Sequence, residues 1–174
     1  MSMILEFPWF ERQFDFVQPV WMFPNILERL RGTPARLEEC VAGLSSELRT
    51  RWIGEEWSIQ ENAGHLLDME ALWLGRLDDF LNGVETLRAA DLTNRKTYDA
   101  QHNDTAIEKI LAAFRRERAA LLIRLDALDE ATVLKTALHP RLLQPMRVID
   151  HAYFVAEHDD HHLAQITRLK RQFQ

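Results

Sequence analysis

Apolar residues recur along this chain at intervals of three and four positions, the spacing that places side chains on one face of an α-helix. The pattern covers four segments, at about 26–44, 59–82, 105–128 and 146–172. We find no alternating run of apolar and polar residues that would favour a strand. The pattern therefore predicts an all-α fold, a four-helix bundle in which residues 1–174 form a single domain.

Polar residues mark the expected helix ends. Ser58, followed three positions later by Glu61, matches a capping box, and the Asn-Gly pair at 82–83 favours the end of the same helix. Thr105 and Glu108 match a second capping box. These matches set both ends of the second helix and the start of the third.

The first segment contains a predicted break. Gly32 interrupts the apolar pattern, Thr33 is a favourable N-cap, and Pro34 fits the first position of a new helix. We therefore expect a split helix whose second part begins at Pro34. Cys40 lies on the apolar stripe of this second part, which indicates a core residue and not a nucleophile.

The connections between the segments set the topology. Residues 83–103 form a long polar crossover between helices two and three, of the kind that crosses a fold or covers a site. With a short first link and a medium third link, helices two and three run parallel and helix four runs antiparallel to helix two. The predicted order is up-down-down-up. Residues 1–23 are rich in aromatic residues but lack periodicity, so we expect an N-terminal arm that packs across the core or a partner subunit.

Composition and charge restrict the class of protein. The net charge is −6 and no block of Lys and Arg lies on one face, so we expect no nucleic-acid binding. Cys40 is the single cysteine, which excludes an internal disulfide and fits a reducing cytoplasm. No apolar run approaches the about 20 residues that span a membrane, and the first residues lack the basic start of a signal peptide. We expect a cytoplasmic protein without a membrane partner.

Three histidines stand out in this pattern. His158 and His162 lie one turn apart on one face of the last helix, and His65 lies on the inward stripe of the second. At about 1.5 Å per residue, His65 is roughly 10 Å from the start of its helix, and His162 and His158 are roughly 15 and 21 Å from the end of theirs. Because those helices are antiparallel, the three imidazoles reach similar depth. Buried imidazoles each need a partner, and a shared divalent metal ion satisfies all three.

Three imidazoles with open remaining positions indicate a reactive centre, because structural zinc sites are closed. Such a centre lowers the pKa of a bound water molecule or of a substrate thiol. Glu61 lies one turn before His65 and either orients it, serves as a base, or acts only in the capping box. The other residues expected near the mouth of the site are Trp52, Trp57, Asn62 and His102, with His161 turned away from the ion.

The remaining polar residues on the inward stripes are interpreted as structural. His151 lies two turns before His158, too far along the helix to bind the same ion. His139 belongs to the link at the opposite end of the bundle and is expected to be remote. Arg76 is interpreted as a buried cation with a carboxylate partner.

Two stretches, 57–70 and 156–166, resemble the DinB-like superfamily, which includes YfiT-type metal-dependent hydrolases. The resemblance implies an up-down-down-up four-helix bundle, often dimeric. It also implies a nickel or zinc ion held by the family's three histidines, which match His65, His158 and His162. Relatives include S-transferases and isomerases that use low-molecular-weight thiols.

The leading hypothesis is thus a metal-dependent enzyme of the DinB type, either a hydrolase or a thiol S-transferase that acts on a small molecule. The alternative is a non-catalytic metal-binding protein of stress or detoxification that binds a ligand without turnover. A zincin-type protease is disfavoured, because Asp159 follows His158 where that motif requires Glu.

Overall fold

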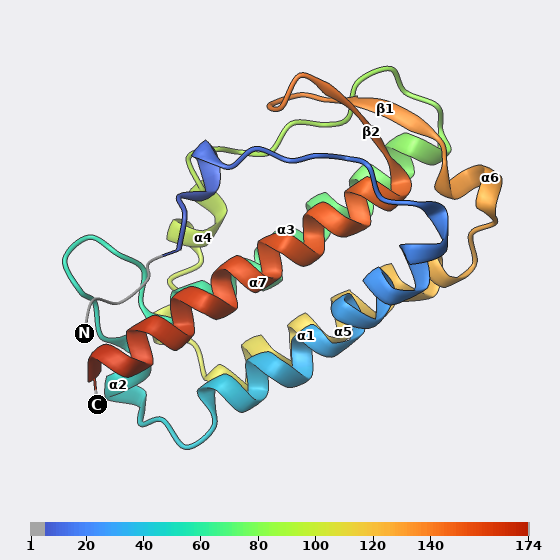
Figure 1. Ribbon diagram of the computed structural model, residues 1–174. Coiled ribbons are helices and arrows are strands. Elements are labelled where there is room, and N and C mark those ends of the chain that lie inside the picture. The colour runs from blue at the N-terminus through green and yellow to red at the C-terminus, as the bar shows by residue number, and fades with distance from the viewer. Residues whose placement is uncertain (1–5, 174) are drawn as a thin grey trace.

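The computed structural model describes residues 6–173 and is built from four long helices that pack side by side (Figure 1). They are α1 (Phe23–Val41), α3 (Ile59–Leu81), α5 (Ile107–Asp126) and α7 (Val148–Phe173). Helices α1 and α7 run in one direction, and α3 and α5 run in the other. Each helix packs against two others, α1 and α3 both contacting α5 and α7. The prediction of an all-α four-helix bundle is confirmed.

The interior contains two apolar clusters, one toward each end of the bundle. One cluster includes Leu30, Leu77 and Phe154, and the other includes Leu37 and Phe114. The two clusters bury the periodic positions of all four helices. Across residues 6–173, no helix is long and apolar enough to cross a membrane.

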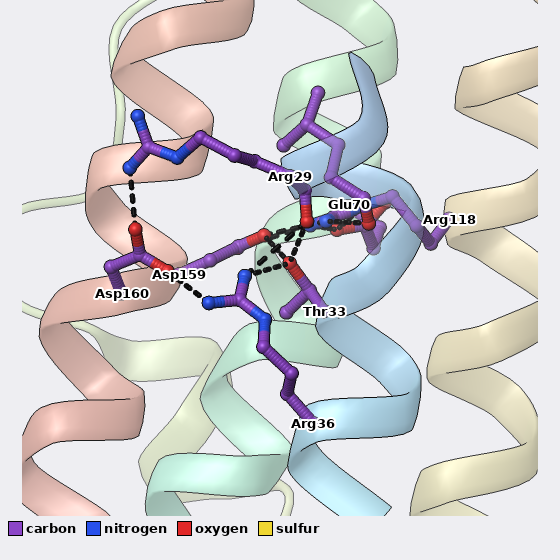
Figure 2. A network of polar contacts seen from close by, with 8 residues as sticks. Arg29, Thr33, Arg36, Glu70, Arg118, Asp159 and Asp160 are labelled. Carbon is purple, nitrogen blue, oxygen red and sulfur yellow. Dashed lines mark hydrogen bonds and ion pairs between the residues drawn. The ribbon is translucent and has the colours of Figure 1, made fainter. Parts of the chain in front are cut away.

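A buried polar layer lies where the four helices meet, at the centre of the network in Figure 2, and each helix contributes one buried side chain to it. Arg118 of α5 donates to Glu70 of α3 at 2.6 Å and to Asp159 of α7 at 2.5 Å. The hydroxyl of Thr33 in α1 donates to the same Asp159 carboxylate at 2.8 Å. Burial raises the pKa of Glu70 to about 7, although Arg118 opposes the shift. Because an unpaired buried charge is costly, this layer favours the observed pairing of helices.

The predicted break at Pro34 is wrong, since α1 continues through it. A proline lacks the N–H group that would bond the carbonyl oxygen of Leu30. In its place, Arg118 donates to that oxygen at 3.2 Å. Thr33 does not cap a new helix, because its hydroxyl faces Asp159 and, at 3.1 Å, the carbonyl oxygen of Arg29 one turn earlier in α1. Contacts from distant helices therefore complete a helix that local sequence would interrupt.

One of the two predicted capping boxes is confirmed. At the start of α3, Ser58 Oγ accepts from the Glu61 N–H at 3.1 Å, and Glu61 Oε2 accepts from the Ser58 N–H at 2.8 Å. The second is wrong, because α5 begins one residue later, after Ala106, with no side-chain cap. Glu108 then occupies the second helical position and cannot make the box with Thr105.

The links contain short elements that the periodicity did not predict. A two-stranded antiparallel hairpin of β1 (Thr136–His139) and β2 (Gln144–Arg147) precedes α7, with Thr136 opposite Arg147. The expectation of no strand is therefore wrong, because four-residue strands are too short to show alternation. The other short elements are η1 (Trp9–Glu11), η2 (Val20–Met22), α2 (Ser46–Thr50), α4 (Arg95–Asp99), η3 (His102–Asp104) and α6 (Glu130–Val133).

The N-terminal arm packs across this chain's own bundle (Figure 1). Phe14 is buried in the first apolar cluster. Arg147, just before α7, donates to the carbonyls of Phe16 and Gln18 at 3.4 and 3.0 Å. The first five residues of the predicted arm, 1–5, lie outside the described residues. Trp9 and Phe10 of the arm line the cavity described below.

Candidate metal centre

Three histidines converge from two antiparallel helices. His65 comes from α3, and His158 and His162 come from α7. One ring nitrogen of each lies within 4.8 Å of the others. The ring centroids are 4.6 to 5.3 Å apart, and all three side chains are buried. The convergence follows from the topology, because α3 begins at the end of the bundle where α7 finishes.

Burial keeps these imidazoles neutral. It lowers the pKa of His65 to about 4 and holds the pKa values of His158 and His162 well below the ordinary histidine range. The proximity of the other rings lowers the pKa values of His158 and His162 further. Neutral rings keep a lone pair, which is the form in which imidazole binds a metal.

Hydrogen bonds orient two of the rings. Asn62 donates through its amide nitrogen to the carbonyl of Ser58 at 2.9 Å, so its Oδ1 faces His162 and accepts from Nδ1–H at 2.8 Å. His162 is therefore the Nδ1–H tautomer, with its Nε2 lone pair available. The hydroxyl of Thr97 lies 2.9 Å from Nδ1 of His65 and can play the same part.

The donor set fits a divalent transition metal. Imidazole nitrogens suit zinc, nickel, copper and iron, and their number leaves further coordination positions for other ligands. Three buried imidazoles whose candidate ligand nitrogens lie within 4.8 Å of one another are better explained by a shared ligand than by packing.

A cavity of about 810 Å³ opens beside the cluster. Trp57, Asn62 and His161, all expected near the site, line it together with the three histidines. The ring of Trp57 lies 4.7 Å from that of His65, and Trp9 of the arm lies 5.1 Å from His158 between centroids. The two indoles therefore contact different histidines of the cluster.

Three expected neighbours lie away from the described cavity wall. His102 donates through Nε2–H to the Asp68 carboxylate at 2.7 Å, and its ring lies against Gly64, where a Cβ atom would come within 2.2 Å. The Glu61 carboxylate accepts from the indole N–H of Trp52 at 2.7 Å in addition to its capping bond. Both bonds are accepted by Oε2 and hold the carboxylate at the start of α3, so the geometry favours the capping role for Glu61 over a role as base.

Two interpretations of inward polar residues are wrong. His139 is not remote, because the cavity extends along the bundle to the hairpin and His139 lines it. Arg76 has no carboxylate within ion-pair distance among the described residues, because Arg88 binds Asp79 at 2.7 Å and offers Arg76 only its carbonyl, at 3.1 Å. Arg76 lies three turns after His65 on the same stripe of α3, and this spacing could have predicted that it lines the cavity.

The comparisons with known proteins agree with this architecture. The family model of the DinB superfamily matches residues 29–166, and the chain belongs to this superfamily. Among solved structures, the fold is similar to that of YfiT from Bacillus subtilis, with a TM-score of 0.80 and 18% identity over 93% of each chain. That protein is described as a probable metal-dependent hydrolase with an unusual four-helix bundle topology. At this identity the likeness shows the fold alone. A comparison with curated proteins gave no match.

Proposed function

We propose that this protein is a metal-dependent hydrolase of the DinB type that acts on a small molecule. Its divalent ion, zinc or nickel, is held by His65, His158 and His162. The observation that carries the proposal is the convergence of three buried, neutral imidazoles on the wall of a cavity large enough for a small molecule. The description of YfiT as a probable metal-dependent hydrolase supports the reaction class.

When bound, a divalent ion lowers the pKa of a water molecule or a thiol and polarises a carbonyl group. The chain's own residues prepare the site for this chemistry. Asn62 and Thr97 hold the rings of His162 and His65 in the ligating orientation. Trp57 and Trp9 pack against His65 and His158, which limits the access of water to these rings and strengthens electrostatic contacts within the cluster.

Metal analysis of the purified protein tests the site. Replacement of His65, His158 or His162 by Ala is expected to remove most of the bound ion. His161→Ala is the matched control, since His161 belongs to α7 and lines the same cavity but lies outside the cluster. This variant is expected to retain the ion. Unchanged metal content in the three cluster variants would refute the proposed centre.

Activity assays decide between the reaction classes. The metal-loaded protein is expected to hydrolyse small esters or amides without an added thiol, and His162→Ala is expected to abolish this turnover. A thiol S-transferase is the second candidate, because about 810 Å³ accommodates a substrate beside a low-molecular-weight thiol. Turnover only with an added thiol would favour that reaction. Metal binding without turnover of either kind would favour the non-catalytic alternative.

A further inference from the structure

The end of the cavity nearest the hairpin is lined by hydrogen-bond donors. Arg76 of α3, His139 of β1 and Arg141 of the hairpin loop all contribute to this wall. Among the described residues, neither arginine has a carboxylate within ion-pair distance. Arg76 is 1% exposed, so its charge is almost completely removed from bulk water. A buried guanidinium without a direct ion-pair partner is unfavourable, and the wall therefore favours an anion.

The hydrogen bonds of His139 define which of its nitrogens carries the proton. Its Nδ1 faces the backbone N–H groups of Arg141 and Leu142, at 3.3 and 3.1 Å. A backbone N–H can only donate, so Nδ1 is the acceptor and the hydrogen lies on Nε2. Nε2 lies 3.1 Å from Nη1 of Arg76, which is also a donor. The two groups therefore face each other with no acceptor between them.

Two further N–H groups of this cavity lack acceptors. Nη2 of Arg141 and Nε1 of Trp73 are buried without a hydrogen-bond partner among residues 6–173. The surroundings are desolvated, since burial lowers the pKa of Arg76 to about 10 and, helped by the two arginines, that of His139 to about 3. His139 is thus neutral, while each guanidinium remains charged at neutral pH. The wall combines two positive charges with a surplus of donors.

An apolar section lies between this wall and the histidine cluster. The guanidinium carbon of Arg76 lies 5.7 Å from the ring centroid of Trp73, which in turn lies 5.4 Å from that of His158. Trp73 and Phe154 line the cavity between the wall and the cluster, with ring centroids 6.1 Å apart. An apolar section with polar groups at its two ends is suited to an elongated molecule whose middle is apolar.

We propose that Arg76, Arg141 and His139 form a carboxylate subsite, and that the substrate is an elongated, largely apolar molecule with a terminal carboxylate. The planar forks of the two guanidinium groups match the two oxygens of a carboxylate. The acceptor oxygens would satisfy Nε2–H of His139, Nη1 of Arg76 and Nη2 of Arg141. The second half of this inference rests on the proposed function, because it places the reacting bond at the histidine cluster.

Calorimetric titration of the chelator-treated, metal-free protein tests the subsite alone. The probes are the ω-phenyl carboxylates from phenylacetate to 6-phenylhexanoate. Each is compared with its primary amide, which has nearly the same shape but no charge. We expect the best carboxylate to bind about tenfold or more tightly than its amide, as a charge-assisted hydrogen bond in a buried site implies. Equal affinity for acid and amide, or no binding of any carboxylate at millimolar concentration, would overturn the subsite.

The variants separate this wall from the rest of the cavity. Arg141→Gln, at a half-buried position, is expected to abolish the preference for the carboxylate over its amide. Arg76→Met is expected to have the same effect, provided that the variant folds. Arg168→Gln is the matched control, because Arg168 lines the cavity but is paired with Glu6 at 3.1 Å and Glu56 at 2.8 Å. A preference for the acid that persists in Arg141→Gln would refute the assignment.

The metal-loaded protein then tests the substrate class. An ester with a terminal carboxylate is expected to lose about tenfold in kcat/KM in Arg141→Gln, while a neutral ester of equal length is unaffected. Equal losses for both esters would refute the assignment of the carboxylate. Failure of the metal centre would appear separately, as unchanged metal content in His162→Ala, because the titrations above contain no ion.

Discussion

Replacement of Asn62 by Leu removes the acceptor that orients one proposed metal ligand. Asn62 is buried, and its Oδ1 accepts from Nδ1–H of His162 at 2.8 Å. Leucine is similar in size and cannot accept, so the buried donor loses its partner at a cost of about 1–3 kcal/mol. A shift of the proton to Nε2 would avoid that cost but would block the lone pair needed for the ion. Either outcome weakens metal binding by about 10- to 100-fold, which corresponds to about 1.4–2.7 kcal/mol.

Competition with a chromophoric chelator measures the zinc affinity of each variant, and thermal unfolding of the metal-free proteins verifies the fold. Asn103→Leu is the matched control. Asn103 accepts from Ser58 Oγ at 2.7 Å at the same helix start but makes no hydrogen bond to a histidine of the cluster. We expect its zinc affinity to match that of the parent protein. A folded Asn62→Leu variant with an affinity within a factor of about two of the parent would refute the orienting role.

Three further predictions concern stability. Arg118→Leu leaves two buried carboxylates unpaired and should lower the free energy of unfolding in urea by about 3–5 kcal/mol; a loss below about 1 kcal/mol would contradict the buried layer. Burial lowers the pKa of His151 to about 3, so the unfolded chain binds a proton below about pH 6.5 that the folded one does not. The free energy of unfolding should therefore fall as the pH is lowered between those two values, by up to about 1.4 kcal/mol per pH unit. Parallel urea titrations measure this fall, which should be shallower in His151→Gln. Gly64→Ala should displace His102, lower the free energy of unfolding by about 1–3 kcal/mol and therefore lower the melting temperature. An unchanged melting temperature would contradict the close contact.

The sequence predicted correctly those features that depend on residues close to one another in the chain. The capping box of Ser58 and Glu61 starts α3 as expected, because its hydrogen bonds join neighbours in sequence. Helical spacing also placed His65 at the depth of His158 and His162, since rise per residue and helix direction determine depth. The fold class followed from the same periodicity.

The missed features depend on contacts between distant segments. Pro34 stays within α1 because a donor arrives from α5. His139 and Arg141 reach the cavity through a hairpin whose strands are too short for a periodic signal. Trp9 lies against His158 although the arm shows no periodicity at all. In each case, the information lies in how the elements assemble and not in the spacing of residues within one element.

The proline in α1 also bears on how the chain assembles. An isolated α1 peptide would lack both the N–H at residue 34 and the guanidinium of Arg118, so its middle would favour an interrupted helix. The continuous helix becomes favourable only once α5 is docked. Local helix formation in α1 and long-range docking are therefore coupled, and compact states with α5 in another position leave the Leu30 carbonyl without its donor. A residue that removes a hydrogen bond within one helix thus makes the correct assembly of the bundle more selective.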